Sequence, residues 1–102
     1  MDKDFLNEFV YKIECLSKVM TKDDAIVDQY GIHQKATVLD HYVCVAKDLI
    51  RHGEYLIALE NMLDNLIDSS IYLDESIIRL ARQAFGDKIT KEYELILEKV
   101  SK

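Results

Sequence analysis

Three histidines are the side chains of this 102-residue chain best suited to bind a metal ion or to move a proton near neutral pH. They are His33, His41 and His52, separated by 8 and 11 residues. A zinc site on a helix needs histidines three or four residues apart, often as H-E-x-x-H, because that spacing places both on one face. The observed spacing therefore favours structural or surface histidines over metal ligands.

Two cysteines, Cys15 and Cys44, could act as nucleophiles if a neighbour lowered their pKa. Both fall in the middle of expected helices, away from a helix N-terminus. His41 precedes Cys44 by three residues, which places the two on one helix face, but no oxyanion donor accompanies the pair. The cysteines also lack C-x-x-C spacing and a secretory context. We expect two reduced thiols and no disulfide.

Other patterns for catalysis or cofactor binding are missing from the sequence. Three isolated glycines cannot form a phosphate-binding loop, and no Glu-x-x-His occurs that would mark a carboxylate-bridged metal bundle. The sequence therefore predicts no catalytic residue, no metal and no cofactor. An enzymatic function is disfavoured.

An acidic stripe is the feature that goes beyond ordinary amphipathic patterning. Glu60, Asp64 and Asp68 are spaced four residues apart, so they share one helix face although like charges at that spacing repel each other. Such a face can simply be solvated. It can also be a docking surface for a basic partner, in which an exposed apolar residue ringed by charge serves as the anchor. The residues expected to contact a partner are Ile57, Glu60, Asn61, Asp64, Asp68, Asp74 and Glu75.

Apolar residues at helical spacing predict the elements that carry these side chains. Gly31, Gly53 and Gly86 each follow such a stretch, where glycine ends a helix well, and Asp74 and Thr90 are expected N-caps. One core is expected to include Leu59, Leu63, Leu66, Ile78 and Phe85. The expected helices, caps included, span 5–20, a short 21–31, 35–52, 54–68, 74–86 and 90–100, and residues 71–73 form an extended connection.

Composition supports an all-α fold in a single domain over residues 1–102, a compact bundle of five or six helices. Proline is absent and only three glycines occur, so the tight turns of a β-sandwich are not available. The formal net charge of −6 argues against nucleic acid or an anionic membrane as the ligand and favours a basic protein. No apolar run approaches a membrane span or a signal peptide, so a cytoplasmic location is expected.

Residues 49–86, LIRHGEYLIALENMLDNLIDSSIYLDESIIRLARQAFG, resemble the MafI-type immunity protein family. The shared features are a helix ending in Gly53-Glu54-Tyr55, then Ala58-Leu59-Glu60 with Leu63 and Leu66 in the next helix, an Ile71-x-Leu73 connection, and a final apolar helix closed by glycine. The resemblance covers 38 of the 102 residues. The first 48 residues and the last 16 stand outside it.

The resemblance implies a small cytoplasmic inhibitor that neutralises the toxin domain of a bacterial contact-dependent competition system. It further implies that this toxin is a nuclease, such as a ribonuclease. A nuclease binds a polyanion through a basic cleft, so an acidic helical protein is suited to cover it. The alternative from the residues alone is a helical adaptor or regulatory module unrelated to toxins. If the gene for this chain lies directly downstream of a large toxin gene, the immunity hypothesis is favoured over the adaptor hypothesis.

Overall fold

Five α-helices form in the described part of the chain where apolar residues recur at helical spacing. The computed structural model describes residues 1–20 and 34–102 in full and residues 25–28 and 31–33 as backbone. The helices are α1 (Lys3–Val19), α2 (Lys35–Arg51), α3 (Tyr55–Asp68), α4 (Glu75–Phe85) and α5 (Lys91–Val100), with a 3-10 turn at Gly86–Lys88. The all-α bundle predicted from the sequence is confirmed.

Local sequence explains where these helices begin and end. The Asp2 carboxylate accepts bonds from the amides of Asp4 and Phe5 at the start of α1, and Thr90 Oγ accepts one from the amide of Tyr93 in α5. After α2, Gly53 has a φ of +77°, a left-handed conformation that glycine adopts without steric cost. The hairpin of α2 and α3 is therefore as short as the sequence predicts.

The segment between α1 and α2 differs from its predicted structure. Strands β1 (Ala25–Asp28) and β2 (Gly31–Gln34) pair antiparallel, with Ala25 opposite Gln34 and Asp28 opposite Gly31. The expected short helix over 21–31 is therefore wrong at 25–28, and Gly31 begins a strand instead of ending a helix. Residues 21–24 and 29–30 of that prediction lie outside the described residues. Neighbouring β-branched residues at 26 and 27 favour extended backbone, and an isolated helix of this length is marginal.

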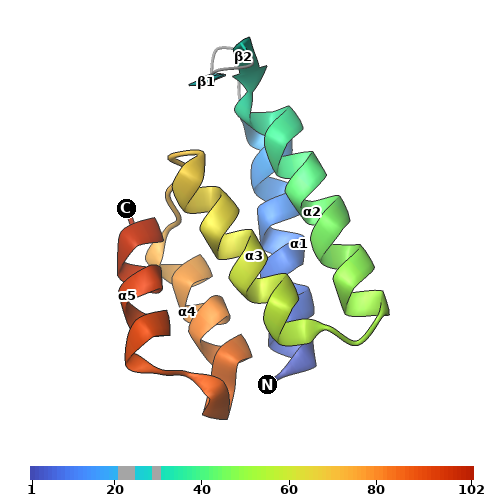
Figure 1. Cartoon of the computed structure of the whole chain (residues 1–102), viewed down its shortest axis with the longest axis vertical. Helices are drawn as coiled ribbons and strands as arrows, with labels where there is room; N and C mark the ends of the chain where they lie inside the picture. The colour runs from blue at the N-terminus through green and yellow to red at the C-terminus, as the bar shows by residue number, and fades with distance from the viewer. Residues whose placement is uncertain (21–24, 29–30) are drawn as a thin grey trace.

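The helices pack as shown in Figure 1, with α1 behind and α3 crossing the front between α2 and α5. Helix α1 packs against α2 and α4, and α3 packs against α2 and α5. The Cα radius of gyration is 13.1 Å, as expected for a compact chain of this length. Within the described residues, no helix is both long enough and apolar enough to cross a membrane.

One hydrophobic core joins all five helices. The five residues predicted to share it, Leu59, Leu63, Leu66, Ile78 and Phe85, are all at most 3% exposed and belong to a single cluster. The extended connection after α3 is also confirmed, because Ile71 and Leu73 turn inward while Tyr72 stays exposed. Leu73 closes this end of the bundle with backbone bonds: its amide donates to Val100 O at 2.7 Å, and its carbonyl accepts from the amide of Lys102 at 3.1 Å.

Candidate functional site

The outer side of α3 carries four of the predicted partner-binding residues on one line. Ile57, Asp64 and Asp68 are exposed, and Asn61 between them is half-buried. We call these four residues the α3 ridge. Since they are spaced four, three and four residues apart, they form one stripe along the helix, on the side opposite Leu59, Leu63 and Leu66. The fold therefore presents the ridge to solvent on the helix that crosses the front of the bundle (Figure 1).

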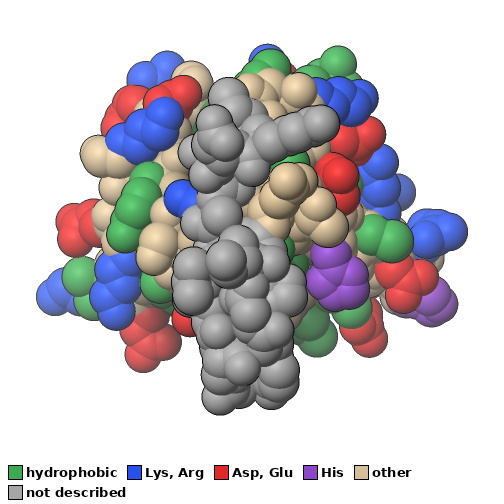
Figure 2. Space-filling model, turned by 90° about the horizontal axis from the view of Figure 1, so that it is seen from above, with side chains coloured by type: hydrophobic (Ala, Val, Ile, Leu, Met, Phe, Trp, Pro, Cys, Tyr) green, Lys and Arg blue, Asp and Glu red, His purple; other side chains and the backbone are tan. Residues whose placement is uncertain are grey.

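The charge of the ridge is of one sign, because its helix carries no basic side chain. Helix α3 contains no Lys or Arg, and Asp64 and Asp68 have no ion-pair partner within the described residues. Some carboxylates on other helices pair with cations, as Glu14 does with Lys47 at 2.6 Å and Glu94 with Arg82 at 3.0 Å. Seen from the end of the bundle where β1 and β2 lie, the visible rim mixes basic and acidic side chains (Figure 2). The ridge thus presents two carboxylates on a helix without Lys or Arg, whereas other described helices carry both signs of charge.

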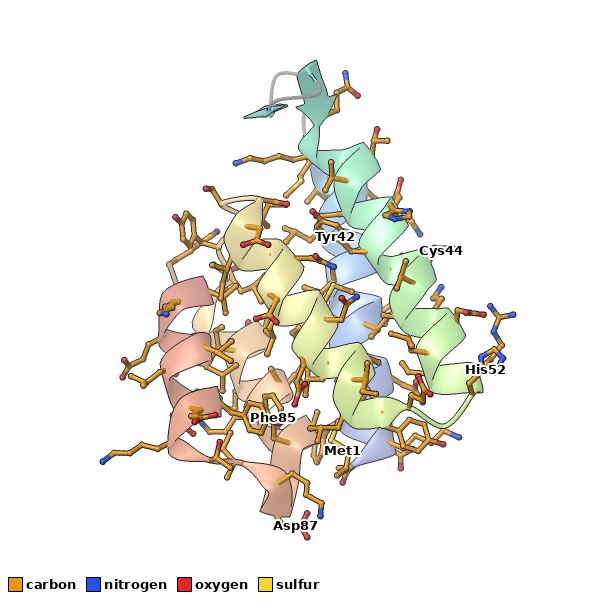
Figure 3. All side chains as sticks on the ribbon, in the orientation of Figure 1. Met1, Tyr42, Cys44, His52, Phe85 and Asp87 are labelled. Carbon is orange, nitrogen blue, oxygen red and sulfur yellow. The ribbon has the colours of Figure 1, made fainter. Side chains whose placement is uncertain are left out.

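Glu60 belongs to the predicted stripe but lies differently from Asp64 and Asp68. It is half-buried at the contact between α3 and α5, where the Tyr93 hydroxyl donates a hydrogen bond to its carboxylate. This bond, followed by partial burial, raises the pKa of Tyr93, so the phenol stays protonated and remains the donor. The Tyr93 ring stacks on Phe85, with centroids 4.4 Å apart and an interplanar angle of 18°. Phe85 itself lies near the lower end of the bundle (Figure 3).

Asp74 and Glu75, also predicted to bind a partner, lie on a different element from the ridge. Asp74 occupies the N-cap position of α4, but its side chain makes no capping bond and instead pairs with Lys102 Nζ at 3.1 Å. Glu75 stands in the first turn of α4, where a negative charge interacts favourably with the helix dipole. Both residues therefore have roles within the fold. The ion pair between Lys102 and Asp74 could not be predicted from the spacing of residues in the sequence.

The residues considered for catalysis are dispersed. Cys44 and His41 are exposed on α2, and Cys15 is half-buried on α1. At the end of α2, His52 projects away from the bundle with its Nδ1 2.8 Å from the carbonyl oxygen of Asp48 (Figure 3). The side chain of His33 lies outside the described residues. Among the described side chains, no group of three or more His, Cys, Asp or Glu residues is placed to hold a metal ion.

A groove of about 530 Å³ between α1 and α2 is one of several hollows in the described structure whose size would suit a ligand. It is lined by Asn7, Val10, Tyr11, Glu14, Lys47, Ile50 and Arg51. The groove contains both signs of charge, and the Glu14 and Lys47 side chains within it already pair with each other. The charge of the groove therefore favours neither an acidic nor a basic partner, whereas the charge of the ridge favours a basic one.

A scan against protein-family models found no match for this chain, and searches of the curated proteins and of the solved structures found none. The resemblance to MafI-type immunity proteins therefore stays a prediction based on residues 49–86.

Proposed function

We propose that this chain is an immunity-type inhibitor that binds a basic toxin domain through the α3 ridge and has no chemistry of its own. The observation that carries the proposal is the ridge itself. Two exposed carboxylates without an ion-pair partner among the described residues follow an exposed apolar residue along a helix that contains no Lys or Arg. Ile57, which is 52% exposed, supplies the apolar anchor, and Asp64 and Asp68 supply the charge.

The charges of the ridge work against the stability of the isolated helix, which supports a role outside folding. Asp64 and Asp68 repel each other at a spacing of four residues. Asp68 is also the last residue of α3, where the helix dipole disfavours negative charge and no basic side chain compensates it. A cationic partner surface would convert both unfavourable terms into attraction.

A nuclease toxin has the complementary surface, because an enzyme that binds a polyanion presents basic side chains around its cleft. A single-sign patch on the inhibitor accelerates encounter with such a cleft and rejects acidic surfaces. Together with the family resemblance, this favours a ribonuclease or another nuclease as the target. The inhibitor would act in the cytoplasm of the cell that makes the toxin.

The test uses the toxin domain encoded by the gene directly upstream, produced with and without this chain. We expect the wild-type chain to bind this domain and to protect cells that express it. Asp64→Lys together with Asp68→Lys should abolish protection, and Ile57→Asp should do the same, while circular dichroism stays helical.

A matched control changes the net charge equally at other exposed positions. Glu8→Lys together with Glu98→Lys alters two exposed carboxylates, on α1 and α5, and should preserve protection. If ridge and control variants protect equally well, the binding surface is elsewhere. If the wild-type chain does not bind the domain, the adaptor hypothesis replaces the inhibitor hypothesis.

A further inference from the structure

Glu60 sits beside the α3 ridge and is fixed by a neighbouring helix. The donor is a neutral phenol, so the hydrogen bond from Tyr93 orients the carboxylate without cancelling its charge. The pairs that Lys47 makes with Glu14 and Arg82 with Glu94 differ in this respect, because there a cation neutralises the carboxylate. Glu60 is therefore held in place by a neutral donor, and no cation pairs with it among the described residues.

Tyr93 is itself anchored well enough to serve as a fixed donor. Its ring stacks on Phe85, which is fully buried in the core. Its backbone amide donates to Thr90 Oγ at 3.3 Å, which ties it to the first turn of α5. The hydroxyl thus projects from a rigid part of the bundle toward α3.

We propose that Tyr93 is a positioning residue for partner recognition, which holds the Glu60 carboxylate in one orientation at the α5 edge of the ridge. The proposal rests on the proposed function and extends the docking surface from α3 onto α5. A glutamate on a free surface loses rotamer freedom when a partner immobilises it, and that loss weakens binding. With Tyr93 in place, the ordering has already occurred during folding.

The direct test is Tyr93→Phe, which keeps the ring stacked on Phe85 and removes only the donor. We expect binding of the purified toxin domain to weaken about threefold to tenfold, the scale set by ordering one flexible side chain. The loss should appear in the dissociation rate. The association rate and its salt dependence should stay at wild-type values, because the charge of Glu60 is retained.

Tyr42→Phe is the matched control, because the Tyr42 hydroxyl also joins two helical segments, through a hydrogen bond with the Ser69 hydroxyl. This variant should bind as the wild type does, although it too loses an inter-segment bond. Equal weakening by both Tyr→Phe changes would show a general loss of rigidity and would overturn the positioning role.

A double-mutant cycle identifies Glu60 as the residue through which Tyr93 acts. In a Glu60→Ala background, Tyr93→Phe should have no further effect on the dissociation rate. A full additional effect there would overturn the proposal. If Tyr93→Phe binds normally while Asp64→Lys with Asp68→Lys does not bind, the positioning role fails and the proposed function stands. If neither change affects binding, the positioning role and the assignment of binding to the ridge both fail, and the binding surface lies elsewhere.

Discussion

Removing the charge at the end of α3 should stabilise the free protein. Asp68→Asn keeps the size of the side chain and eliminates two unfavourable terms. Relief of the repulsion with Asp64, four residues away, contributes about 0.2–0.5 kcal/mol. Relief of the unfavourable dipole interaction in the last turn contributes about 0.3–1 kcal/mol. The free energy of unfolding should therefore rise by about 0.5–1.5 kcal/mol, since Asp68 has no partner in the described structure to lose.

The assay is thermal and urea unfolding at low ionic strength, repeated in about 1 M salt, where the Debye length falls to about 3 Å. For a chain of this length the expected gain corresponds to an increase in Tm of about 2–10 °C at low salt. Most of this gain should disappear at high salt. Binding of the toxin domain should change in the opposite direction and weaken.

Asp4→Asn provides a control of opposite sign. Asp4 is exposed in the first turn of α1, where its charge is favourable to the dipole, so its removal should lower stability. The reasoning is refuted if Asp68→Asn lowers stability at low salt, or leaves it unchanged, while Asp4→Asn behaves as expected. In that case the charge of Asp68 does not lower the stability of the free protein, and its presence gives no support to a role in partner binding.

Three further predictions concern the fold. Leu63→Ala should lower the free energy of unfolding by about 2–5 kcal/mol in urea titration, because Leu63 is fully buried in the common core. Arg82 holds the pKa of Glu94 below its ordinary value of 4.5, mainly by hydrogen bonding. This contact stabilises the fold above pH 4.5 and the contribution is lost as the pH falls through the lowered pKa, so Glu94→Gln should lower stability at pH 7 and flatten its decline in acid. Cys15→Ser with Cys44→Ser should leave helicity and protection intact, as measured by circular dichroism and co-expression.

The helices and their common core could be predicted because their signals are local. Apolar residues spaced three and four apart define a buried face, and Gly53, Gly86 and Thr90 define helix ends. These signals do not depend on contacts with distant residues. The start of α3 was predicted at residue 54 and occurs at Tyr55, and its end at Asp68 was predicted correctly. The outward direction of Asp64 and Asp68 follows from the same periodicity.

Features that depend on contacts between distant residues could not be predicted in this way. The pairing of Glu60 with Tyr93 spans 33 residues and requires α5 to lie beside α3. The pairing of Asp74 with Lys102 similarly depends on where the chain returns after α5. The pairing of β1 with β2 could not be predicted in the same way. Thr21 followed by Asp23-Asp24 fits the start of a helix, and this signal outweighs the β-branched pair Ile26-Val27 that follows.

Under the proposed function, one face of α3 serves folding and the opposite face serves partner recognition, so mutations on the two faces should have separable effects. Leu59, Leu63 and Leu66 face the core, whereas the ridge faces solvent, and the backbone of α3 connects the two sets rigidly. A core truncation such as Leu63→Ala can reach the ridge only by moving or unfolding the whole helix. While the variant remains folded, its affinity for the toxin domain should therefore match that of the wild type, as measured by calorimetry well below its Tm. A large loss of affinity in folded Leu63→Ala would mean that recognition depends on the packing of α3 and not on its outer surface.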